Sequence, residues 1–283
     1  MLPKDPGPIG VFDSGYGGLT ILKEIRAALP QYDYLYLGDN ARAPYGTRSF
    51  PLVLEFTTQA VHRLFAMGCH LVILACNTAS AKALRTIQQQ CLPQWDADRR
   101  VLGVIRPTTE CVASLTRTRH IGVMATEGTI ASHTYDIEIT KLHPGMVVTG
   151  QPCPMWVPLV ENGEADSEGA DYFVRKDINR LLQRDPLIDT IILGCTHYPL
   201  LLNKIRQYAP PQVRIVAQGE YVARSLADYL TRHTGLSTLI TRTATTRYLT
   251  TEDPSRFNPS ASLFMGTAVE ATHITLDTIP TFH

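Results

Sequence analysis

The sequence lacks the features that mark a membrane, secreted or nucleic-acid-binding protein. Lys and Arg together number 26, as do Asp and Glu, so the 283-residue chain has no formal net charge. Such a balance argues against a basic surface for nucleic acid or for a membrane. No stretch approaches the roughly 18 apolar residues of a spanning helix, and the opening MLPKDPGPIGVF has no signal-peptide core. With 44% hydrophobic residues, the composition easily supplies a packed core.

Familiar cofactor motifs are also missing. GYGG follows an apolar run, but Thr20 stands where a dinucleotide-binding Gly-x-Gly-x-x-Gly motif would need its third glycine. There is no Walker A pattern, and no lysine stands out as a Schiff-base residue for pyridoxal phosphate. We therefore expect no cofactor.

The cysteines form no Cys-x-x-Cys pair. They are scattered through a chain that has ample core: Cys69, Cys76, Cys91, Cys111, Cys153 and Cys195. This distribution is typical of reduced thiols in a cytosolic protein.

Short apolar runs alternate with helical patterns along the chain. The runs cover residues 9–12, 33–39, 71–76, 101–105, 121–126, 190–195 and 213–217. Nearly continuous apolar runs suit strands that are buried on both faces of a parallel sheet. Between them, Leu19, Leu22, Ile25 and Leu29 form one apolar stripe, and Phe56, Ala60, Leu64 and Met67 form another. This alternation predicts an α/β fold.

Two phrases occur in both halves of the chain. IGVFDSG at 9–15 resembles IGVMATEG at 121–128, and LVILACNT at 71–78 resembles TIILGCTH at 190–197. Apolar strands resemble one another by chance, but here the order of the phrases is also the same. We expect two similar α/β halves, each with one cysteine at the carboxyl end of a strand.

This position makes Cys76 and Cys195 the candidate reactive thiols. Ligands of open α/β sheets bind beyond the carboxyl ends of the strands. A cysteine there also opens a helix, where backbone N–H groups favour the thiolate. Cys69, Cys91 and Cys111 lie within or beside helical stretches, where an inert buried thiol is expected. Cys153 lies between two prolines and is not placed by its pattern.

Three chemistries can use two such thiols. A redox disulfide is disfavoured by the missing Cys-x-x-Cys motif. A zinc site needs three or four ligands; His70 and His197 lie near the two thiols, although neither spacing is usual for zinc. The third chemistry is proton transfer, in which one thiol removes a proton from a carbon and the other returns one to its opposite face. That reaction is a racemisation or epimerisation.

Several motifs make the chain resemble the glutamate racemase branch of the aspartate/glutamate racemase superfamily. They are GVFDSGYGGLT, YLGDNARAPYGTRS, LACNTASA, CPMWVPLVENG and ILGCTHYPLL, and the resemblance extends from about residue 9 to residue 230. It implies two Rossmann-like domains with mainly parallel sheets and an active site in the cleft between them. The domains are expected at 1–103 with 218–283, which includes Cys76, and at 104–217, which includes Cys195.

The resemblance also implies roles for individual residues. Cys76 and Cys195 match the two catalytic acid/bases, and no metal is expected. Residues that assist or tune the thiols are Asp13, Asp39, Glu161 and His197. Residues expected to contact the substrate are Asp13, Ser14, Tyr45, Gly46, Asn77, Thr78, Thr196 and His197. Taken singly, the Ser, Thr and Asn residues also suit helix capping, and the carboxylates suit solvated loops.

Glutamate is the substrate that the resemblance implies, with D-glutamate supplied for peptidoglycan synthesis. The assembly is expected to be a homodimer that binds neither nucleic acid nor membrane. Aspartate racemase is the alternative enzyme, because it shares the thiol pair. A different class of function is a non-catalytic, gyrase-binding role on the same scaffold; the presence of both cysteines favours the enzyme.

Overall fold

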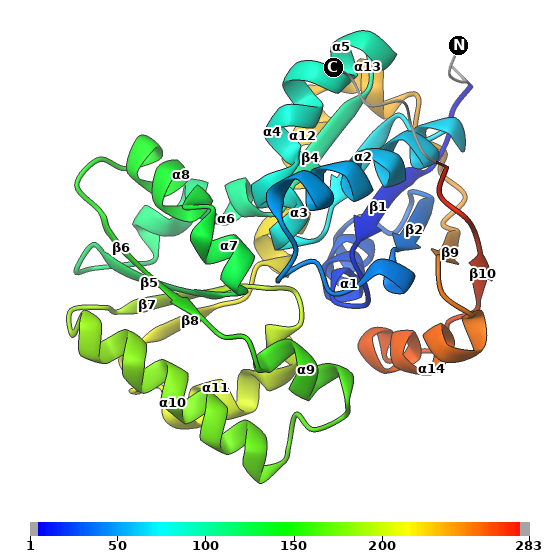
Figure 1. Ribbon diagram of the computed structural model, residues 1–283. Helices are drawn as coiled ribbons and strands as arrows, with labels where there is room; N and C mark the ends of the chain where they lie inside the picture. Colours follow the sequence, from blue (N-terminus) through cyan, green and yellow to red (C-terminus); the bar gives the residue numbers. More distant parts are fainter. Residues whose placement is uncertain (1–4, 278–283) are drawn as a thin grey trace. The chain divides into compact units, whose positions relative to one another are not determined.

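A computed structural model describes residues 5–277, and Figure 1 shows their arrangement. The chain divides into two compact units: residues up to Val104 together with those from Gly219 onward, and Ile105–Gln218. Each unit has its own sheet, and neighbouring strands are parallel throughout both sheets. The predicted α/β class with parallel sheets is therefore confirmed.

Within the described residues, the first unit has a six-stranded sheet in the order β10-β9-β2-β1-β3-β4. Its strands are β1 Ile9–Asp13, β2 Tyr34–Gly38, β3 Leu71–Leu74, β4 Arg100–Gly103, β9 Thr246–Thr250 and β10 Ala271–His273. Its helices are α1 Gly18–Ala28, η1 Asn40–Arg42, α2 Phe50–Ala66, α3 Asn77–Lys82, α4 Leu84–Thr86, η2 Ile87–Cys91, α5 Leu92–Trp95, α12 Gly219–Arg232, α13 Thr234–Ser237 and α14 Pro254–Met265.

The core of the first unit follows from the pleat of its strands. Alternate residues of a strand point to opposite faces, so Phe12, Leu37 and Leu74 join the buried cluster beneath α2. On α1, the predicted stripe is buried at Leu19, Leu22 and Ile25, and α1 packs against α12. Burying one such side chain contributes about 1.5–3 kcal/mol. Helices therefore cover both faces of this sheet, as a buried parallel sheet requires.

The second unit, which the structure describes in full, has a four-stranded sheet in the order β6-β5-β7-β8. Its strands are β5 His120–Ala125, β6 Val147–Pro152, β7 Thr190–Gly194 and β8 Arg214–Val216. Its helices are α6 Ile105–Cys111, η3 Val112–Ser114, α7 Glu127–Ala131, α8 Thr134–Leu142, α9 Trp156–Glu161, α10 Glu168–Arg184, η4 Tyr198–Leu201 and α11 Leu202–Tyr208. In Figure 1, α10 and α11 cover one face of this sheet, and α7 and α8 the other.

The strand orders reveal the internal repeat that the sequence predicts. Across the sheet of the second unit, the first strand of the chain lies between the second and the third, and the fourth follows the third. β1 to β4 of the first unit have the same order across their sheet. Cys76 comes just after the third strand of one set, and Cys195 directly after the third strand of the other. The repeated phrase thus corresponds to a repeated position in the fold.

The apolar runs of the sequence correctly locate β1 to β5, β7 and β8. The pattern misses β6, β9 and β10. β6 and β10 are edge strands, and their residues are mostly half-buried or exposed. β9 has the polar sequence TRYLT. Such strands need no continuous apolar run, so periodicity alone does not reveal them.

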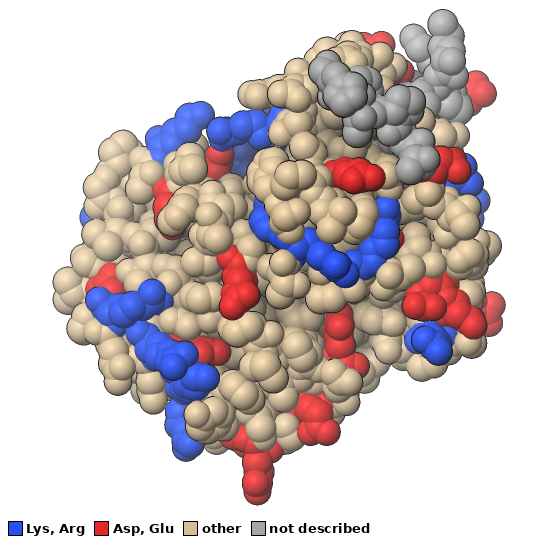
Figure 2. Space-filling view, viewed as in Figure 1, with Lys and Arg blue, Asp and Glu red and all other residues tan. Residues whose placement is uncertain are grey.

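The surface agrees with the balanced composition. On the face seen in Figure 2, cationic and anionic side chains are interspersed. None of the helices within residues 5–277 combines the length and the apolar character that a membrane crossing requires.

Candidate active site

Cys76 lies at the start of a helix, as the sequence predicts. It follows β3 and is the N-cap residue of α3, and its Sγ accepts a hydrogen bond from the backbone N–H of Ala79 at 3.4 Å. Ser, Thr, Asp and Asn are the usual residues at this position, and here a thiol takes it. The backbone N–H groups at the start of a helix favour an anion there. The side chain is 6% exposed.

Side chains from the end of β1 lie beside this thiol. Ser14 Oγ is 3.3 Å from Cys76 Sγ, and Asp13 Oδ2 accepts a hydrogen bond from Gly15 N at 2.9 Å. Burial, followed by the charges of Asp13 and Cys76, raises the pKa of Tyr36 well above its usual range. Tyr36 is thus close to both groups. Asp13 is buried, so its reading as a solvated loop acid is wrong.

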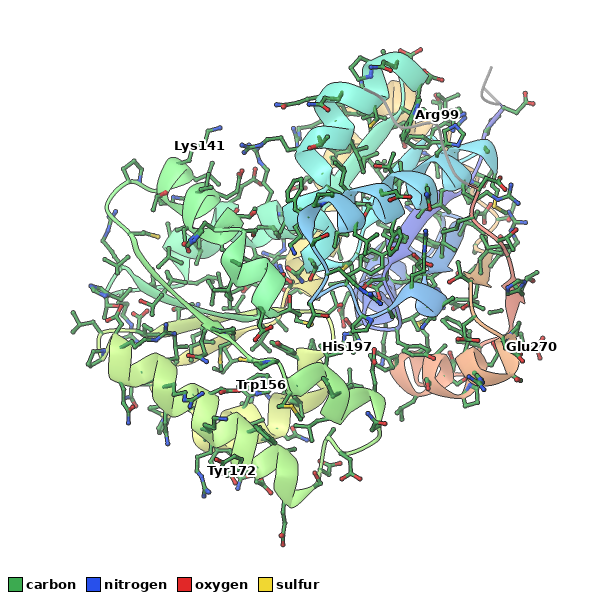
Figure 3. All side chains as sticks on the ribbon, viewed as in Figure 1. Arg99, Lys141, Trp156, Tyr172, His197 and Glu270 are labelled. Carbon is green, nitrogen blue, oxygen red and sulfur yellow. The ribbon has the colours of Figure 1, made fainter. Side chains whose placement is uncertain are left out.

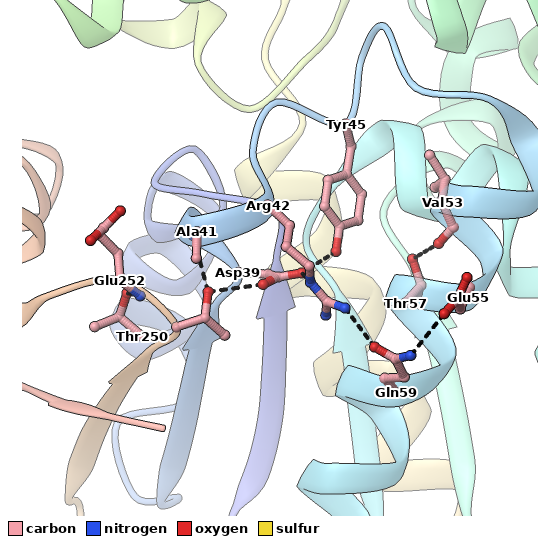
Figure 4. A network of polar contacts seen from close by, with 11 residues as sticks. Asp39, Ala41, Arg42, Tyr45, Val53, Glu55, Thr57, Gln59, Thr250 and Glu252 are labelled. Atoms are coloured by element: carbon pink, nitrogen blue, oxygen red, sulfur yellow. Dashed lines mark hydrogen bonds and ion pairs between the residues drawn. The ribbon is translucent and has the colours of Figure 1, made fainter. Parts of the chain in front are cut away.

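The loop after β2 contributes a second polar cluster, drawn in Figure 4. Tyr45 donates a hydrogen bond to Asp39 Oδ2, which also accepts one from Arg42 Nε at 2.7 Å. Asp39 is fully buried, so the solvated reading is wrong for it as well. Burial, then the neighbouring Asp39, raises the pKa of Tyr45 well above its usual range, and the charge of Cys76 adds to the effect. Tyr45 therefore lies within electrostatic reach of Cys76.

The remaining residues predicted for the first unit lie in the same elements. Asn77 and Thr78 are buried and form the first turn of α3. Gly46 follows Tyr45 in the loop between η1 and α2 and is half-buried. Sequence reasoning missed Tyr36, which gives no motif signal because it stands in the middle of an apolar strand.

Cys195 in the second unit has a different set of neighbours. Its Sγ is 3.8 Å from His197 Nδ1, and His197 Nε2 is 2.9 Å from Glu161 Oε1. His197 is buried, whereas the side chain of Glu161 is 29% exposed. Burial opposes protonation of the imidazole, but the hydrogen bonds and charges of Cys195 and Glu161 outweigh it and raise the pKa of His197. An imidazole beside a thiol is placed to exchange a proton with it.

Aromatic packing brings these elements together. Trp156, at the start of α9, packs on Tyr198 at the start of η4, with ring centroids 4.8 Å apart. Tyr198 also donates a hydrogen bond to the carbonyl of Cys153 at 3.1 Å. The two short helices therefore hold Glu161 against His197. Figure 3 labels Trp156 and His197 in this part of the second unit.

Thr196, the last predicted residue, is buried between Cys195 and His197. The structure adds two residues without a sequence signal. Tyr135 of α8 lies near Cys195, whose charge adds to the effect of burial in raising the tyrosine pKa. Gln218 Nε2 donates a hydrogen bond to Tyr135 Oη at 2.8 Å.

The other cysteines differ from these two. Burial raises the pKa of Cys69 to about 12, raises that of Cys153 well above its usual range, and also raises that of Cys91. Cys111 is half-buried and directs its Sγ to carbonyls of its own helix. Cys69 and Cys91 are buried as expected, whereas Cys111 is only half-buried, and the inertness of all three thiols stays a prediction. Within residues 5–277, no group of three or more His, Cys, Asp and Glu side chains is arranged to hold a metal ion.

Known proteins share both the sequence pattern and the fold. Residues 18–226 match the family described as Asp/Glu/hydantoin racemase. A glutamate racemase of Roseobacter denitrificans is 39% identical over 272 residues, which cover 93% of this chain and 98% of that protein.

Solved structures agree with this relationship. A glutamate racemase of Bacillus anthracis, isoform RacE1, has a TM-score of 0.86 at 34% identity and covers 95% of this chain and 98% of its own. A glutamate racemase of Francisella tularensis in complex with D-glutamate has a TM-score of 0.85 at 30% identity, covering 97% and 100%.

Proposed function

Because the chain belongs to the Asp/Glu/hydantoin racemase family, we propose that it interconverts L- and D-glutamate without a cofactor, using Cys76 and Cys195 as the two acid/bases. One observation carries the proposal. Each thiol follows the third strand of the same four-strand arrangement, one in each unit, and each has polar neighbours that suit proton transfer. The two compact units are then the two catalytic domains.

The reaction conserves protons in each direction. One thiolate removes the Cα proton and becomes a thiol, and the electron pair of the C–H bond is delocalised into the α-carboxylate. The opposite thiol then donates its proton to the other face of Cα and becomes a thiolate. The reverse direction uses the thiols in exchanged roles. An unactivated Cα proton is far less acidic than a thiol, so the site must stabilise the developing charge with fixed donors.

The first domain supplies such donors around Cys76. Ser14 and the first turn of α3, with Asn77 and Thr78, place hydroxyl, amide and backbone N–H groups near the thiol. These groups suit the α-carboxylate. Asp13 suits the substrate ammonium or a proton relay to Cys76.

The second domain tunes Cys195 through a charged pair. His197, held by Glu161, lies 3.8 Å from the Cys195 thiol and suits proton exchange with it on that side. Thr196 adds a short hydroxyl donor for the substrate. The first domain completes the proposed substrate contacts with Tyr45 and Gly46, which lie on the loop held by Asp39.

Glutamate is the proposed substrate because the similar proteins are named glutamate racemases, one of them with D-glutamate bound. The cellular role that follows is the supply of D-glutamate for peptidoglycan synthesis in the cytoplasm, by a homodimer. Aspartate racemisation is the alternative that the same thiol chemistry allows. Circular dichroism of L-glutamate and L-aspartate incubated with purified protein distinguishes the two: loss of the glutamate signal supports the proposal, and loss of the aspartate signal alone contradicts it.

Isotope exchange tests the two-thiol mechanism. In heavy water, the first product molecules should contain deuterium at Cα, because the incoming hydrogen comes from the far thiol, which has exchanged with solvent. The remaining substrate should stay protonated. Early product that retains the substrate hydrogen would indicate a single base and contradict the mechanism.

Replacing each thiol by Ser tests the assignment of the two residues. Cys76→Ser and Cys195→Ser should each lower the racemisation rate by about 100-fold or more, since a positioned acid/base contributes that much. Each variant should still catalyse solvent exchange of the enantiomer served by the remaining thiol. Cys111→Ser, at a half-buried cysteine outside the proposed site, is the matched control and should keep the full rate. An unchanged rate in either of the first two variants would remove that thiol from the mechanism.

A further inference from the structure

The part of the chain after residue 237 has no motif, yet it touches two loops of the proposed site. We use the name C-terminal segment for residues Thr246–Met265, which include β9 and α14. β9 pairs in parallel with β2, and Thr250 is opposite Gly38. Because parallel strands end at the same edge of a sheet, Thr251 then lies beside Asp39 and the loop that continues to Tyr45.

Thr251 makes three hydrogen bonds to the end of β2 and to this loop. Its backbone N–H donates to the carbonyl of Gly38 at 3.1 Å. Its hydroxyl donates to Asp39 Oδ1 at 2.9 Å and accepts from the backbone N–H of Ala41 at 3.1 Å. One hydroxyl therefore joins the Asp39 carboxylate to the backbone of η1.

The other oxygen of the same carboxylate holds the substrate loop. Asp39 Oδ2 accepts the hydrogen bonds from Tyr45 and from Arg42. Arg42 continues to Gln59 on α2, with Nη1 2.5 Å from Oε1, and its guanidinium lies 4.0 Å from the centre of the Phe56 ring. Figure 4 shows this chain from Asp39 through Arg42 to Gln59. A rotation of Asp39 would break its hydrogen bonds to Tyr45 and Arg42.

α14 makes a second connection, to the loop after β1. The ring of Tyr16 stacks on Phe257 at 5.3 Å and on Phe264 at 6.0 Å between centroids. Both phenylalanines are buried. Tyr16 is two residues from Ser14, whose hydroxyl is 3.3 Å from the thiol of Cys76.

We propose that the C-terminal segment positions the substrate-binding loops of the first domain, with Thr251 as the positioning residue for Asp39 and Tyr45, and Phe257 with Phe264 as the anchor for Tyr16. The role rests on the proposed glutamate racemase function and adds residues that lie outside its motifs. Thr251 acts through Asp39, so its loss should affect how the substrate is held more than the chemistry of the thiols.

Replacement of Thr251 by Val tests this role. Val has the shape of Thr but no hydroxyl, so Asp39 loses a donor and the Ala41 N–H loses its acceptor. We expect KM for glutamate to rise by about 3- to 10-fold, the range that one lost hydrogen bond gives, with a smaller change in kcat. Thr251→Ser keeps the hydroxyl and should restore KM. Thr231→Val removes an exposed hydroxyl on α12 and is the matched control, with no expected change.

Hydrogen–deuterium exchange separates this proposal from the proposed function, because it needs no substrate. In Thr251→Val, amides of residues 39–46 should exchange faster than in the wild type, and Thr251→Ser should resemble the wild type. If the wild-type protein fails to racemise glutamate but the exchange result holds, the substrate assignment is wrong and the positioning role stands. Unchanged KM and unchanged exchange in Thr251→Val would overturn the role of Thr251.

The aromatic anchor has its own test. Phe264→Leu should speed exchange in residues 13–17 and raise KM, because Tyr16 loses one of its stacking partners. Leu263→Ala removes a neighbouring side chain of the same helix that is 66% exposed and should change neither quantity. Equal exchange rates for residues 13–17 in Phe264→Leu and Leu263→Ala would refute the anchor.

Discussion

Cys76 and Cys195 occupy equivalent strand ends but have different chemical surroundings. Cys76 has a hydroxyl from Ser14 and a backbone N–H from Ala79. Cys195 has the imidazole of His197, which is itself bound to Glu161. An imidazole can gain or lose a proton near neutral pH, whereas a hydroxyl and a backbone N–H cannot. In the proposed mechanism, each enantiomer of glutamate presents its Cα proton to a different thiol, so such an asymmetry allows kcat and KM to differ individually between the two directions.

The His197 pair predicts a pH dependence of stability. The pKa of His197 is raised to about 10 in the folded protein, against about 6.5 in an unfolded chain. The folded state therefore binds an extra proton between these values, and its stabilisation is complete below about pH 6.5 and lost as pH rises toward 10. Urea unfolding between pH 7 and pH 10 should show stability that falls more steeply in the wild type than in His197→Asn.

The control for this measurement is His133→Asn. His133 is exposed and has a left-handed backbone with φ of 53°, which Asn tolerates. This variant should follow the wild-type curve. Parallel curves for His197→Asn and the wild type would mean that His197 takes up no proton on folding.

The strand–loop–helix element at the start of the first unit depends on close backbone approach. α1 begins at Gly18, directly against the ends of two strands of the first sheet. A Cβ atom at Gly18 would lie 2.6 Å from Asp13 Cβ and 2.9 Å from Ala75 Cβ. The side chains of Asp13 and Ala75 are short and buried, so they cannot move away from an added methyl group. The glycine therefore allows the helix to start against Asp13 and Ala75. Ala75 is the residue that precedes Cys76 in the chain.

This packing predicts the effect of a single methyl group. Gly18→Ala should destabilise the protein by about 1–3 kcal/mol, the usual cost of overpacking, and should lower activity by displacing Asp13. Gly169→Ala is the matched control on α10, where the nearest atom to the new methyl is Ser167 Oγ at 3.4 Å. It should leave stability equal or raise it by about 0.4–1 kcal/mol. Thermal unfolding measures both; equal melting temperatures for the two variants would contradict the close approach at Gly18.

The molecule as a whole repeats one arrangement of four parallel strands, and its charge is balanced. The second unit is inserted into the chain of the first, between Val104 and Gly219. Each unit has its own buried core and one of the two candidate thiols, Cys76 or Cys195. The described residues contain no cluster of side chains suited to a metal, and the sequence has no nucleotide or pyridoxal motif.

A cofactor test follows at this scale. Exhaustive dialysis against a metal chelator should leave the racemisation rate unchanged, and the purified protein should not absorb above the aromatic band. A zinc-dependent enzyme dialysed in parallel provides the control for chelation. Activity that disappears and returns with added zinc would revive the metal hypothesis for Cys195 and His197.

The sequence alone determined the fold class, the repeat and the strand-end positions of the two candidate thiols. Buried parallel strands require continuous apolar runs, and a thiol directly after such a run must lie at the ligand edge of the sheet. The runs at 71–76 and 190–195 therefore predicted both the strands and the sites of Cys76 and Cys195. The resemblance to the family motifs predicted the remaining candidate site residues, because those residues occupy the corresponding motif positions in this sequence.

Tertiary structure alone decided which side chains meet. Asp39 and Thr251 are far apart in sequence, and the parallel pairing of β9 with β2 brings them together. Tyr135 lies near Cys195 because α8 packs on its sheet. Neither contact shows in the periodicity of the sequence. A single hydroxyl after a polar strand, or a single tyrosine ring on a helix, gives no pattern that predicts its partner. Sequence patterns report burial along a strand or helix, whereas hydrogen bonds between distant segments depend on the register in which the sheet assembles.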